Sequence, residues 1–479
     1  MMKKEYQMPS LKEAQIRSRK PREISYDSFV IPEEISGFGK NKYYYLRTYG
    51  CQANVRDSET IAGILELLGY KEADSIDASD FILLNTCAIR ENAEDKVFGE
   101  LGSLKRMKRN NPDLIIGVCG CMAQEEVVVK RILETYSQVD LVFGTHNIHN
   151  LPNLLHQAVF SKEKTIEIYS KEGEIIENLP TKRFGNHKAW VNIMYGCDKF
   201  CTYCIVPYTR GKERSRLPED ILKEVEELKE LGYKEITLLG QNVNAYGKDL
   251  EQAYNIAKLL ADVAERGIPR IRFTTSHPWD FTEELVDVIA TYQNIMPAFH
   301  LPVQSGNNDV LKKMGRRYTV EAYKAIFDSL RKKIPNCTFT TDIIVGFPGE
   351  TEEQFQDTLN LYDYCKFDSA YTFAFSARVG TPAEKMGDTV SLEEKKERLQ
   401  RLNKCVAKYS LMSNRAYLDK KVFVLVDGPS KKDPNIFSGY TEHNKLVNFV
   451  PKNAKVGDIV PVRITQVKSW SLDGEEIEY

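Results

Sequence analysis

The sequence lacks the long apolar runs that membrane-spanning helices need. No stretch of about 18 apolar residues occurs along it, and the amino-terminal segment has no apolar core like that of a secretory signal peptide. An excess of one charge is also missing, since the formal net charge is −2. We therefore expect a soluble, cytoplasmic protein on which any surface for a polyanion is local rather than general.

Cysteine is the residue type that the composition leaves to be explained. The chain has ten cysteines, and disulfides are rare in the reducing cytoplasm. These cysteines are therefore expected to be metal ligands, reactive thiols or buried thiols. Six of them form two groups of three, and the others are Cys119, Cys337, Cys365 and Cys405.

The first part of the chain divides into three segments. Residues 1–42 are polar and of mixed charge, which predicts a loosely ordered extension. Residues 43–160 alternate short apolar runs with amphipathic stretches, a pattern typical of a parallel α/β sheet. Residues 161–186 are charged and irregular, and we expect a linker there that contains a small hairpin.

Two further segments follow, of different classes. Residues 187–413 contain six strand candidates separated by helical stretches, which predicts a partial (βα)6 barrel that is open on one side. Its first helix should begin at Pro218 and end at Gly232, and residues 391–411 should form a long, exposed, charged helix. Residues 414–479 contain four short strand candidates, typical of a small antiparallel β-barrel. The fold class expected is α/β, with an all-β module at the carboxyl end.

Three cysteines lie close together directly after the first barrel strand. Cys197, Cys201 and Cys204 have the spacing C-x3-C-x2-C. Thiolates are the usual ligands of [4Fe–4S] clusters, and three ligands for four irons leave one iron open. An open iron can chelate S-adenosylmethionine, which the cluster can then cleave to a 5′-deoxyadenosyl radical. A zinc site is the alternative, but it needs a fourth nearby ligand that this segment lacks.

This triad, with Tyr203 directly before its last cysteine, resembles the signature of the radical S-adenosylmethionine superfamily. Polar residues or glycines also follow the later barrel strands, at the rim where barrel enzymes place their sites. Turn formation or helix capping explains any one of these residues equally well. The resemblance implies that six side chains bind the cofactor: Tyr203, Gln241, Asn242, His277, Gln304 and Asp342.

Three further cysteines follow three strands of the predicted α/β sheet. They are Cys51, Cys87 and Cys121. The carboxyl ends of parallel strands form a crevice where ligands bind, so three thiolates there predict a second [4Fe–4S] cluster, again with one open iron. Three buried structural cysteines are the alternative. Cys119 lies inside a strand and is expected to be a buried thiol.

The order of these segments resembles the methylthiotransferase family. Family motifs match around Cys51 (TYGCQAN), Cys87 (NTCAIR) and Cys121 (GCMAQ), and residues 414–479 look like a TRAM domain, an RNA-binding β-barrel. The resemblance implies two [4Fe–4S] clusters and two S-adenosylmethionine molecules. One cluster starts the radical, and the auxiliary cluster presents the sulfur that receives a methyl group. No catalytic side chain beyond the cluster ligands is implied.

Residues 85–97 (NTCAIRENAEDKV) are most similar to the branch of this family that acts on N6-dimethylallyladenosine of tRNA, at position 37 next to the anticodon. Residues 88–91 favour this branch over methylthiotransferases for threonylcarbamoyl-adenosine tRNA or for a ribosomal-protein aspartate. A non-enzymatic RNA-binding iron–sulfur protein is a further alternative. The resemblance implies a monomer with three partners: the tRNA anticodon stem–loop, an electron donor such as flavodoxin or ferredoxin, and a sulfur donor.

Basic residues are locally enriched although the net charge is small. Residues 415–470 hold ten Lys or Arg against five Asp or Glu. Basic clusters near aromatic residues suit contacts to RNA phosphates and bases, whereas a solvated face is the alternative. Further clusters are Lys105, Arg106, Lys108 and Arg109; Arg210, Lys212, Arg214 and Arg216; and Lys312, Lys313, Arg316 and Arg317.

Two single residues are also candidates for substrate contacts. Arg378 follows the sixth barrel strand and is expected to face the substrate. Tyr440 stands where the TRAM motif of this branch usually has a basic residue. Stacking on an RNA base is the role that an aromatic residue at this position predicts.

Overall fold

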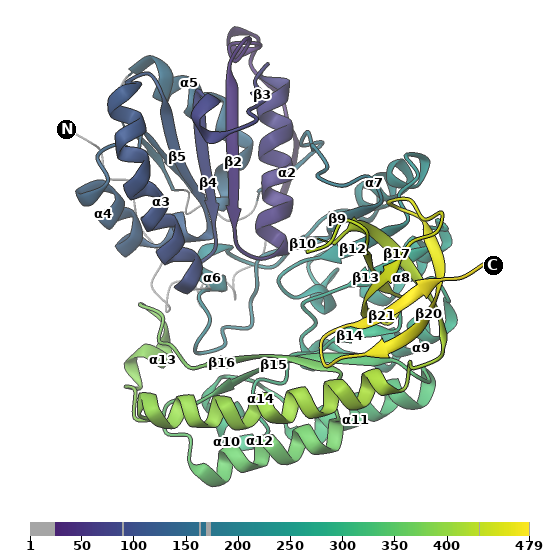
Figure 1. Cartoon of the computed structure of the whole chain (residues 1–479). Coiled ribbons are helices and arrows are strands. Elements are labelled where there is room, and N and C mark those ends of the chain that lie inside the picture. Colours follow the sequence, from purple (N-terminus) through teal and green to yellow (C-terminus); the bar gives the residue numbers. More distant parts are fainter. Residues whose placement is uncertain (1–23, 89–90, 162–163, 169–173, 431, 479) are drawn as a thin grey trace. The chain divides into compact units, whose positions relative to one another are not determined.

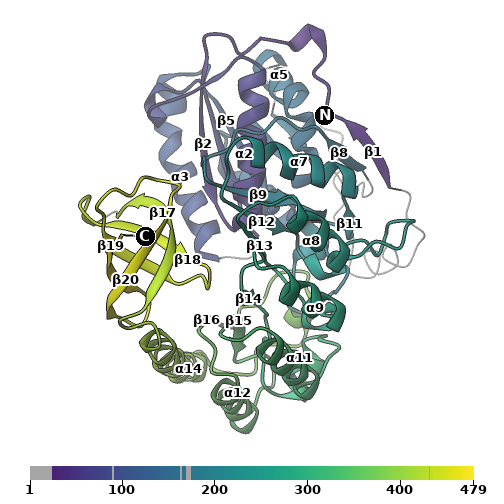
Figure 2. The same cartoon turned by 90° about the vertical axis from the view of Figure 1, so that its right-hand side faces the viewer.

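The computed structural model describes residues 24–88, 91–161, 164–168, 174–430 and 432–478, shown in two views in Figures 1 and 2. The chain forms two compact units. The first comprises residues 1–184, 194–200 and 204–216, and the second comprises residues 185–193, 201–203 and 217–479. None of the helices in the described residues is long and apolar enough to cross a membrane.

The first unit is built around a six-stranded parallel sheet, in the order β3-β2-β4-β5-β6-β7. The strands are β2 (Tyr43–Tyr49), β3 (Lys71–Glu72), β4 (Phe81–Thr86), β5 (Ile115–Gly120), β6 (Leu141–Phe143) and β7 (Thr165–Glu167). All residues of β4 and β5 are buried, because helices cover both faces of the sheet. The parallel α/β fold expected for this region is therefore confirmed.

Four helices form the two outer layers of this sandwich (Figure 1). Helices α2 (Gln52–Leu67) and α5 (Leu151–Ser161) pack against one face of the sheet. Helices α3 (Glu91–Asn110) and α4 (Glu126–Thr135) pack against the other. Short 3-10 helices complete the connections: η1 (Glu33–Ile35), η2 (Ile76–Ala78), η3 (Cys121–Gln124) and η4 (Thr145–Asn150).

Parts of the expected extension and linker form strands instead. β1 (Ser25–Ser28) pairs in parallel with β8 (Glu174–Glu177), and β7 pairs in parallel with β6. The hairpin expected in residues 161–186 is wrong, because β7 and β8 pair with different strands rather than with each other. Their charged composition concealed them, since a single buried side chain such as Ile175 anchors so short a strand.

The second unit contains two three-stranded parallel sheets, β13-β12-β9 and β14-β15-β16. Backbone hydrogen bonds from Ile271 to Asn294 (2.8 Å) and from Met296 to Ile271 (2.9 Å) join them into one row of six strands. The outer strands β9 and β16 do not pair with each other in the described residues, so the expected open, partial barrel is confirmed. Its strands are β9 (Lys188–Asn192), β12 (Glu235–Leu239), β13 (Arg270–Phe273), β14 (Ala298–His300), β15 (Thr338–Val345) and β16 (Ser369–Ala374).

Helices follow the barrel strands as expected. Helix α7 begins at Pro218, and the chain turns out of it at Gly232, whose φ is +84°. The other helices of this unit are α8 (Ile256–Glu265), α9 (Glu283–Thr291), α10 (Asn308–Lys313), α11 (Val320–Lys333), α12 (Glu352–Cys365), α13 (Pro382–Lys385) and α14 (Leu392–Arg415), with η5 (Val243–Ala245) and η6 (Pro278–Asp280).

Helix α14 is less exposed than its charged sequence predicts. The Arg398 guanidinium is buried and lies 3.1 Å from the Glu350 carboxylate, which also accepts a hydrogen bond from the Gly346 backbone. The Lys395 ammonium is buried and donates to the Phe375 carbonyl at 3.1 Å. The charged residues of α14 therefore hold the ends of β15 and β16, and Glu350 at this rim is structural.

The carboxyl-terminal module is a closed five-stranded barrel, drawn in yellow in Figure 2, with the order β17-β18-β19-β21-β20. Its strands are β17 (Lys421–Pro429), β18 (Phe437–Thr441), β19 (Leu446–Val450), β20 (Ile459–Val467) and β21 (Leu472–Glu476). Neighbouring strands are antiparallel except β19 and β21, which are parallel. The small barrel is confirmed, with one strand, β18, more than the four expected.

Charged side chains hold this module against the partial barrel within the second unit. Arg270 donates to the backbone carbonyls of Phe423 (2.9 Å) and Tyr440 (2.8 Å). Lys445 and Asp368 form a buried ion pair at 2.8 Å. Lys445 is therefore not one of the basic residues that could meet RNA.

Candidate iron–sulfur and cofactor sites

The structure places Cys51, Cys87 and Cys121 at the carboxyl ends of three neighbouring parallel strands. Cys51 follows β2 and is the N-cap of α2, Cys87 follows β4, and Cys121 follows β5 and opens η3. Because these strands are paired in register, the three side chains meet at one edge of the sheet. The side chains of Cys51 and Cys87 hydrogen-bond to each other.

The thiol of Cys51 is unusually acidic. Its pKa is lowered to about 5, mainly by the hydrogen bond with Cys87; burial opposes this shift, and the positive charge of Arg210 adds to it. Burial raises the pKa of Cys121, while the Arg210 guanidinium lowers it. The thiolate is the form of cysteine that binds metal, so the site favours the ligand state at Cys51.

Arg210 lies against this trio, on the part of the chain after the triad that belongs to the first unit. Its Nε donates to Cys121 Sγ at 3.1 Å, and its Nη2 lies 2.6 Å from Asp57 Oδ2. Only 7% of Arg210 and 7% of Asp57 are exposed. A buried ion pair therefore adjoins one of the predicted ligand sulfurs.

A backbone turn at Gly120 separates the environments of its two neighbouring cysteines. Gly120 has a φ of +97°, and a Cβ there would lie 2.4 Å from Asn85 Oδ1. Cys119, before the turn, lies in the apolar core with α2 and α5, where burial raises its pKa well above the usual value. Cys121, after the turn, packs against Ala88 instead. The structure thus makes Cys119 a buried thiol outside the trio.

The donors around the trio suit an electron-rich sulfur group. The Tyr208 hydroxyl is buried, has no hydrogen-bond partner among the described residues, and packs in one cluster with Cys121 and Ile205. A buried donor without a partner costs about 1–3 kcal/mol, which a cluster sulfide accepting from it would offset. Three thiols, a guanidinium and a hydroxyl therefore fit an iron–sulfur cluster at this edge.

The triad lies in the loop between β10 (Met194–Tyr195), which pairs with β11 (Arg214–Ser215), and helix α6 (Val206–Thr209). Gly196 precedes Cys197 with a φ of +74°, and a Cβ there would lie 1.9 Å from the Lys212 carbonyl oxygen. The Cys197 backbone N–H donates to the Gly211 carbonyl at 3.0 Å. The start of the cluster loop is thus shaped by backbone contacts from the segment that follows it.

Cys201 has its own buried arginine. Arg316 Nη1 donates to Cys201 Sγ at 3.5 Å, and its other nitrogens donate to the Pro302 carbonyl (2.8 Å) and the Tyr318 hydroxyl (3.1 Å). Only 7% of Arg316 is exposed. No carboxylate pairs with Arg316 in the described part of the chain.

These contacts correct the RNA-binding clusters expected from the sequence. Arg210, Arg214, Arg216 and Arg316 are all buried, so they do not face a polyanion. Arg216, for example, is paired with Glu177 at 2.7 Å. The charge of an arginine does not reveal whether its partner is a phosphate outside or a carboxylate inside the fold, which is why the sequence misled.

The six candidate cofactor contacts all lie in the second unit, and three of them have defined partners there. Asn242 Nδ2 donates to Asp280 Oδ2 at 2.9 Å. Gln304 has a φ of +72° and exchanges backbone hydrogen bonds with β15, accepting from Ile344 and donating to the Asp342 carbonyl.

The other three candidates are placed as follows. Asp342 lies 3.6 Å from the imidazole of His300. His277 is buried and caps η6, and Tyr203 packs edge-on against Phe347, whereas Gln241 directly follows β12 and is partly exposed. The structure brings Gln304 and Asp342 together, and the cofactor contacts stay predictions.

Asn244 was missed by the sequence analysis. It lies in η5 after β12, is 4% exposed, and neither its amide nitrogen nor its amide oxygen has a hydrogen-bond partner among the described residues. A buried amide is normally paired, so a ligand that supplies both a donor and an acceptor is the expected partner. Its position two residues after Asn242 in GQNVNAY was the available signal.

A metal search gives no independent support for either site. Among the described residues, no three His, Cys, Asp or Glu side chains are arranged as ligands of a single metal ion. Ligands of a four-iron cluster bind different irons, whereas a single zinc draws its sulfurs to about 2.3 Å from one point. The six cysteine ligands therefore stay predictions that rest on placement and chemistry.

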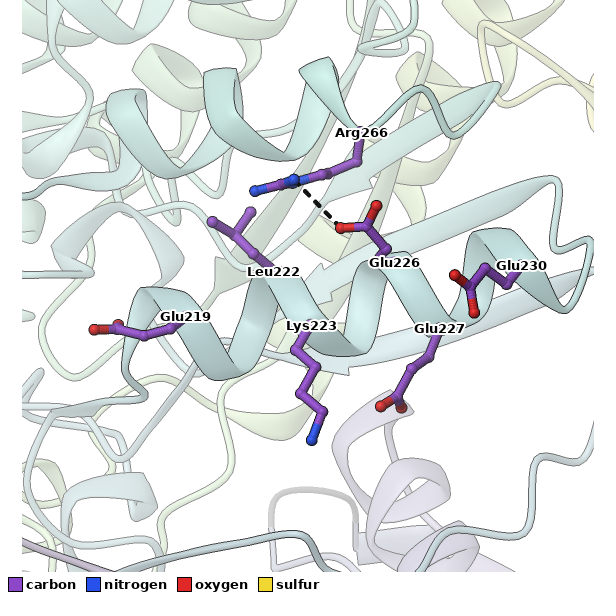
Figure 3. A pocket seen from close by; sticks show the side chains of 7 residues that line it. All are labelled: Glu219, Leu222, Lys223, Glu226, Glu227, Glu230 and Arg266. Carbon is purple, nitrogen blue, oxygen red and sulfur yellow. Dashed lines mark hydrogen bonds and ion pairs between the residues drawn. The ribbon is translucent and has the colours of Figure 1, made fainter.

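A surface pocket of about 540 Å³ lies between α7 and Arg266, on the outside of the second unit (Figure 3). Arg266 is paired with Glu226 at 3.3 Å. The pocket is lined by Glu219, Leu222, Lys223, Glu226, Glu227, Glu230 and Arg266. Four glutamates against two basic residues repel phosphates, so this face does not suit RNA.

Comparisons with known proteins agree with this arrangement. Residues 43–144 match the uncharacterized protein family UPF0004, residues 191–362 match the radical SAM superfamily, and residues 415–477 match the TRAM domain. A solved structure of the radical S-adenosylmethionine methyltransferase TsrM from Kitasatospora setae has a similar fold, with a TM-score of 0.53 and 14% identity over 72% of this chain and 75% of that one. The triad, the partial barrel and these matches define a radical S-adenosylmethionine enzyme, a class that uses this cofactor with a [4Fe–4S] cluster.

Full-length relatives give the family. The chain is 58% identical over 475 residues to the tRNA-2-methylthio-N(6)-dimethylallyladenosine synthase of Staphylococcus epidermidis, covering 99% of this chain and 92% of that protein. The synthases of Bacillus cytotoxicus and Staphylococcus aureus are 58% and 57% identical, with 99% of this chain covered. The chain therefore belongs to the family of tRNA-2-methylthio-N(6)-dimethylallyladenosine synthases, which are transferases.

Proposed function

We propose that this enzyme converts N6-dimethylallyladenosine of tRNA to its 2-methylthio derivative at position 37, using two S-adenosylmethionine molecules and two [4Fe–4S] clusters. The observation that carries the proposal is the second cysteine site. Cys51, Cys87 and Cys121 come from separate strands and meet at one sheet edge beside Arg210. Cofactor cleavage alone needs only the triad, so a second site of this kind favours sulfur insertion over simpler radical chemistry.

The residues of this chain have separate roles in the proposal. When bound, the cluster of Cys197, Cys201 and Cys204 supplies the electron that cleaves the cofactor, and the cluster of the trio supplies the sulfur. Arg210 and Tyr208 provide hydrogen-bond donors beside the trio, and both lie on the segment that begins with Cys204. One segment of the first unit therefore carries a triad cysteine and also contacts Cys121.

The carboxyl-terminal barrel offers exposed basic residues for the anticodon stem–loop. Lys421 on β17 and Arg463 on β20 are register neighbours, and both side chains are exposed. Tyr440 instead packs inside the second unit, where the Lys188 ammonium lies 5.0 Å from its ring centroid, and burial raises its pKa. We therefore assign phosphate contacts to Lys421 and Arg463, and a packing role to Tyr440.

Charge reversal tests this surface. Lys421→Glu with Arg463→Glu should weaken tRNA binding about tenfold and lower the salt dependence of the dissociation constant by about two counterions. Lys223→Glu, which adds charge at the acidic pocket of Figure 3, is the matched control and should leave affinity unchanged. Equal affinity for both variants and the wild type would remove the barrel face from the tRNA site.

The reaction itself is tested with reconstituted, full-length enzyme under anaerobic conditions. An anticodon stem–loop carrying N6-dimethylallyladenosine, methyl-labelled S-adenosylmethionine and a low-potential reductant should yield labelled 2-methylthio nucleoside and 5′-deoxyadenosine, measured by mass spectrometry. A product formed only from threonylcarbamoyl-adenosine RNA, or only from a ribosomal protein, would contradict the substrate. Absence of 5′-deoxyadenosine would leave only an RNA-binding iron–sulfur protein.

The remaining parts of the proposal concern partners and location. We expect a monomeric, cytoplasmic enzyme that takes electrons from a donor such as flavodoxin or ferredoxin and sulfur from a separate sulfur donor. Arg378, which follows β16, stays a predicted substrate contact. Residues 89–90, part of the run that indicated the substrate, lie outside the described residues.

A further inference from the structure

A buried arginine donates a hydrogen bond to one cysteine in each predicted cluster site. Arg210 contacts Cys121 in the first unit with an N···S distance of 3.1 Å, and Arg316 contacts Cys201 in the second unit with one of 3.5 Å. Both arginines are 7% exposed. The two sites therefore share one device although they lie in different folds.

The partners of the two guanidinium groups differ in charge. Arg210 forms an ion pair with Asp57, whose carboxylate is 2.6 Å away and equally buried. The other donors of Arg316 go to neutral oxygens, those of Pro302 and Tyr318, and no carboxylate pairs with it in the described residues. The positive charge is thus cancelled beside Cys121 and left uncompensated beside Cys201.

This difference matters for electron transfer. Reduction of a [4Fe–4S] cluster adds one negative charge, so a fixed positive charge and N–H donors at its sulfurs stabilise the reduced form and raise the reduction potential. The effect is large where water is excluded, because burial weakens dielectric screening. An ion pair contributes much less, since the carboxylate opposes the guanidinium.

We propose that Arg316 raises the reduction potential of the triad cluster, whereas Asp57 cancels the corresponding effect of Arg210 on the cluster of the trio. This inference rests on the proposed function, which places a cluster at each site. One electron from a low-potential donor reduces the triad cluster by one unit of charge, and no covalent bond changes in that step. The electron is thereby directed to the cluster that must pass it to S-adenosylmethionine, and the sulfur-carrying cluster stays oxidised.

Redox titration of the full-length, two-cluster protein tests this inference. Dithionite is the electron donor, and the paramagnetic signal of each reduced cluster is followed by electron paramagnetic resonance. Arg316→Gln should shift the midpoint potential of the triad cluster to more negative values and leave the other cluster unchanged. The signals are assigned with a full-length variant that lacks Cys197, Cys201 and Cys204.

The ion pair gives shifts of opposite sign at the other cluster. Asp57→Asn leaves Arg210 uncompensated and should move the potential of the trio cluster to more positive values. Arg210→Gln leaves the carboxylate uncompensated and should move it to more negative values. The double variant should lie close to the wild type, because both charges are gone.

Two controls separate charge from structure. Arg316→Lys keeps the charge and should keep the potential of the triad cluster near the wild-type value. Arg398→Gln removes another buried arginine of the second unit, paired with Glu350 and with no contact to a predicted ligand, and should shift neither potential.

The failures of the two ideas are distinguishable. Unchanged potentials in Arg316→Gln and Asp57→Asn, in proteins that hold both clusters, would overturn the inference and leave the proposed function intact. Failure of the wild-type protein to hold two clusters would instead overturn the proposed function. If Arg316→Gln does not fold, Asp57→Asn still decides, since it is isosteric and predicts a positive shift.

Discussion

The two cysteine sites are assembled in opposite ways. The triad occupies residues 197–204, in one loop whose start is shaped by contacts of Gly196 and Cys197 with the segment just after it. The trio spans residues 51–121 and exists only because β2, β4 and β5 pair in parallel. A local site can be recognised from spacing, whereas a site built by a sheet depends on the whole fold of its unit.

Removing the triad should have the largest effect. Replacing Cys197, Cys201 and Cys204 with Ala is expected to abolish cleavage of S-adenosylmethionine and to remove about half of the bound iron, because each site holds one four-iron cluster. The measurements are 5′-deoxyadenosine by mass spectrometry and iron per chain. Cys337→Ala, outside both sites, should change neither, and an unchanged iron content in the triple variant would show that the triad binds no cluster.

Removing the trio should separate the two functions. Replacing Cys51, Cys87 and Cys121 with Ala is expected to leave cofactor cleavage but to stop formation of the 2-methylthio product, because sulfur can no longer be presented. Cys119→Ala is the matched control, since this thiol lies in the apolar core. Normal product from the triple variant, or loss of product from Cys119→Ala, would show that the sulfur-carrying ligands are chosen wrongly.

A smaller effect is expected from the glycines that shape each site. Gly120→Ala and Gly196→Ala both force an alanine into a positive φ and against backbone or buried side-chain atoms. Each should lower the free energy of unfolding by about 1–3 kcal/mol, and the iron content of its own site should fall. Unfolding is followed in the cluster-free protein with denaturant.

The control for these substitutions is Gly102→Ala in α3, where a Cβ meets nothing within 4 Å. It should stabilise the protein by up to about 1 kcal/mol, because alanine favours a helix over glycine. An equal loss of stability in all three variants would mean that the positive φ at Gly120 and Gly196 is not what costs energy.

The smallest effect concerns thiol ionisation in the cluster-free protein. The pKa of Cys51 is lowered to about 5, so it is a thiolate throughout the range from pH 6.5 to 8.5, and its alkylation rate should hardly change there. Burial raises the pKa of Cys337 to about 12, so this thiol should stay protonated and unlabelled. Mass spectrometry of iodoacetamide-labelled peptides measures both, and a tenfold rise in Cys51 labelling per pH unit would contradict the lowered pKa.

The sequence predicted the parts of the fold that carry periodic apolar patterns. The parallel sheet of the first unit, the six barrel strands and the start of α7 at Pro218 all follow from such patterns. The strands that it missed, β1, β8 and β18, are short and polar or contain a central glycine, as at Gly439. Their pairing depends on partners distant in sequence, which no local pattern shows.

Arginine shows the same limit for function. Arg210 and Arg316 stand in basic runs that look like RNA-binding clusters, yet both are buried against cysteine sulfur. Lys421 and Arg463 stand in equally ordinary basic surroundings and are exposed. Burial and the identity of the neighbouring atom decide the role of a guanidinium, and both arise only when the chain is folded.

The sequence by itself determined the order of the three segments, the spacing of the triad and the resemblance to methylthiotransferases, because these depend on residues close together in the chain. Only the tertiary structure decided that Cys51, Cys87 and Cys121 share one edge, that Cys119 does not, and that Asp57 neutralises Arg210 whereas Arg316 has neutral partners. The physical reason is that charge compensation and ligand convergence are properties of distance in space, which parallel strand pairing and burial create.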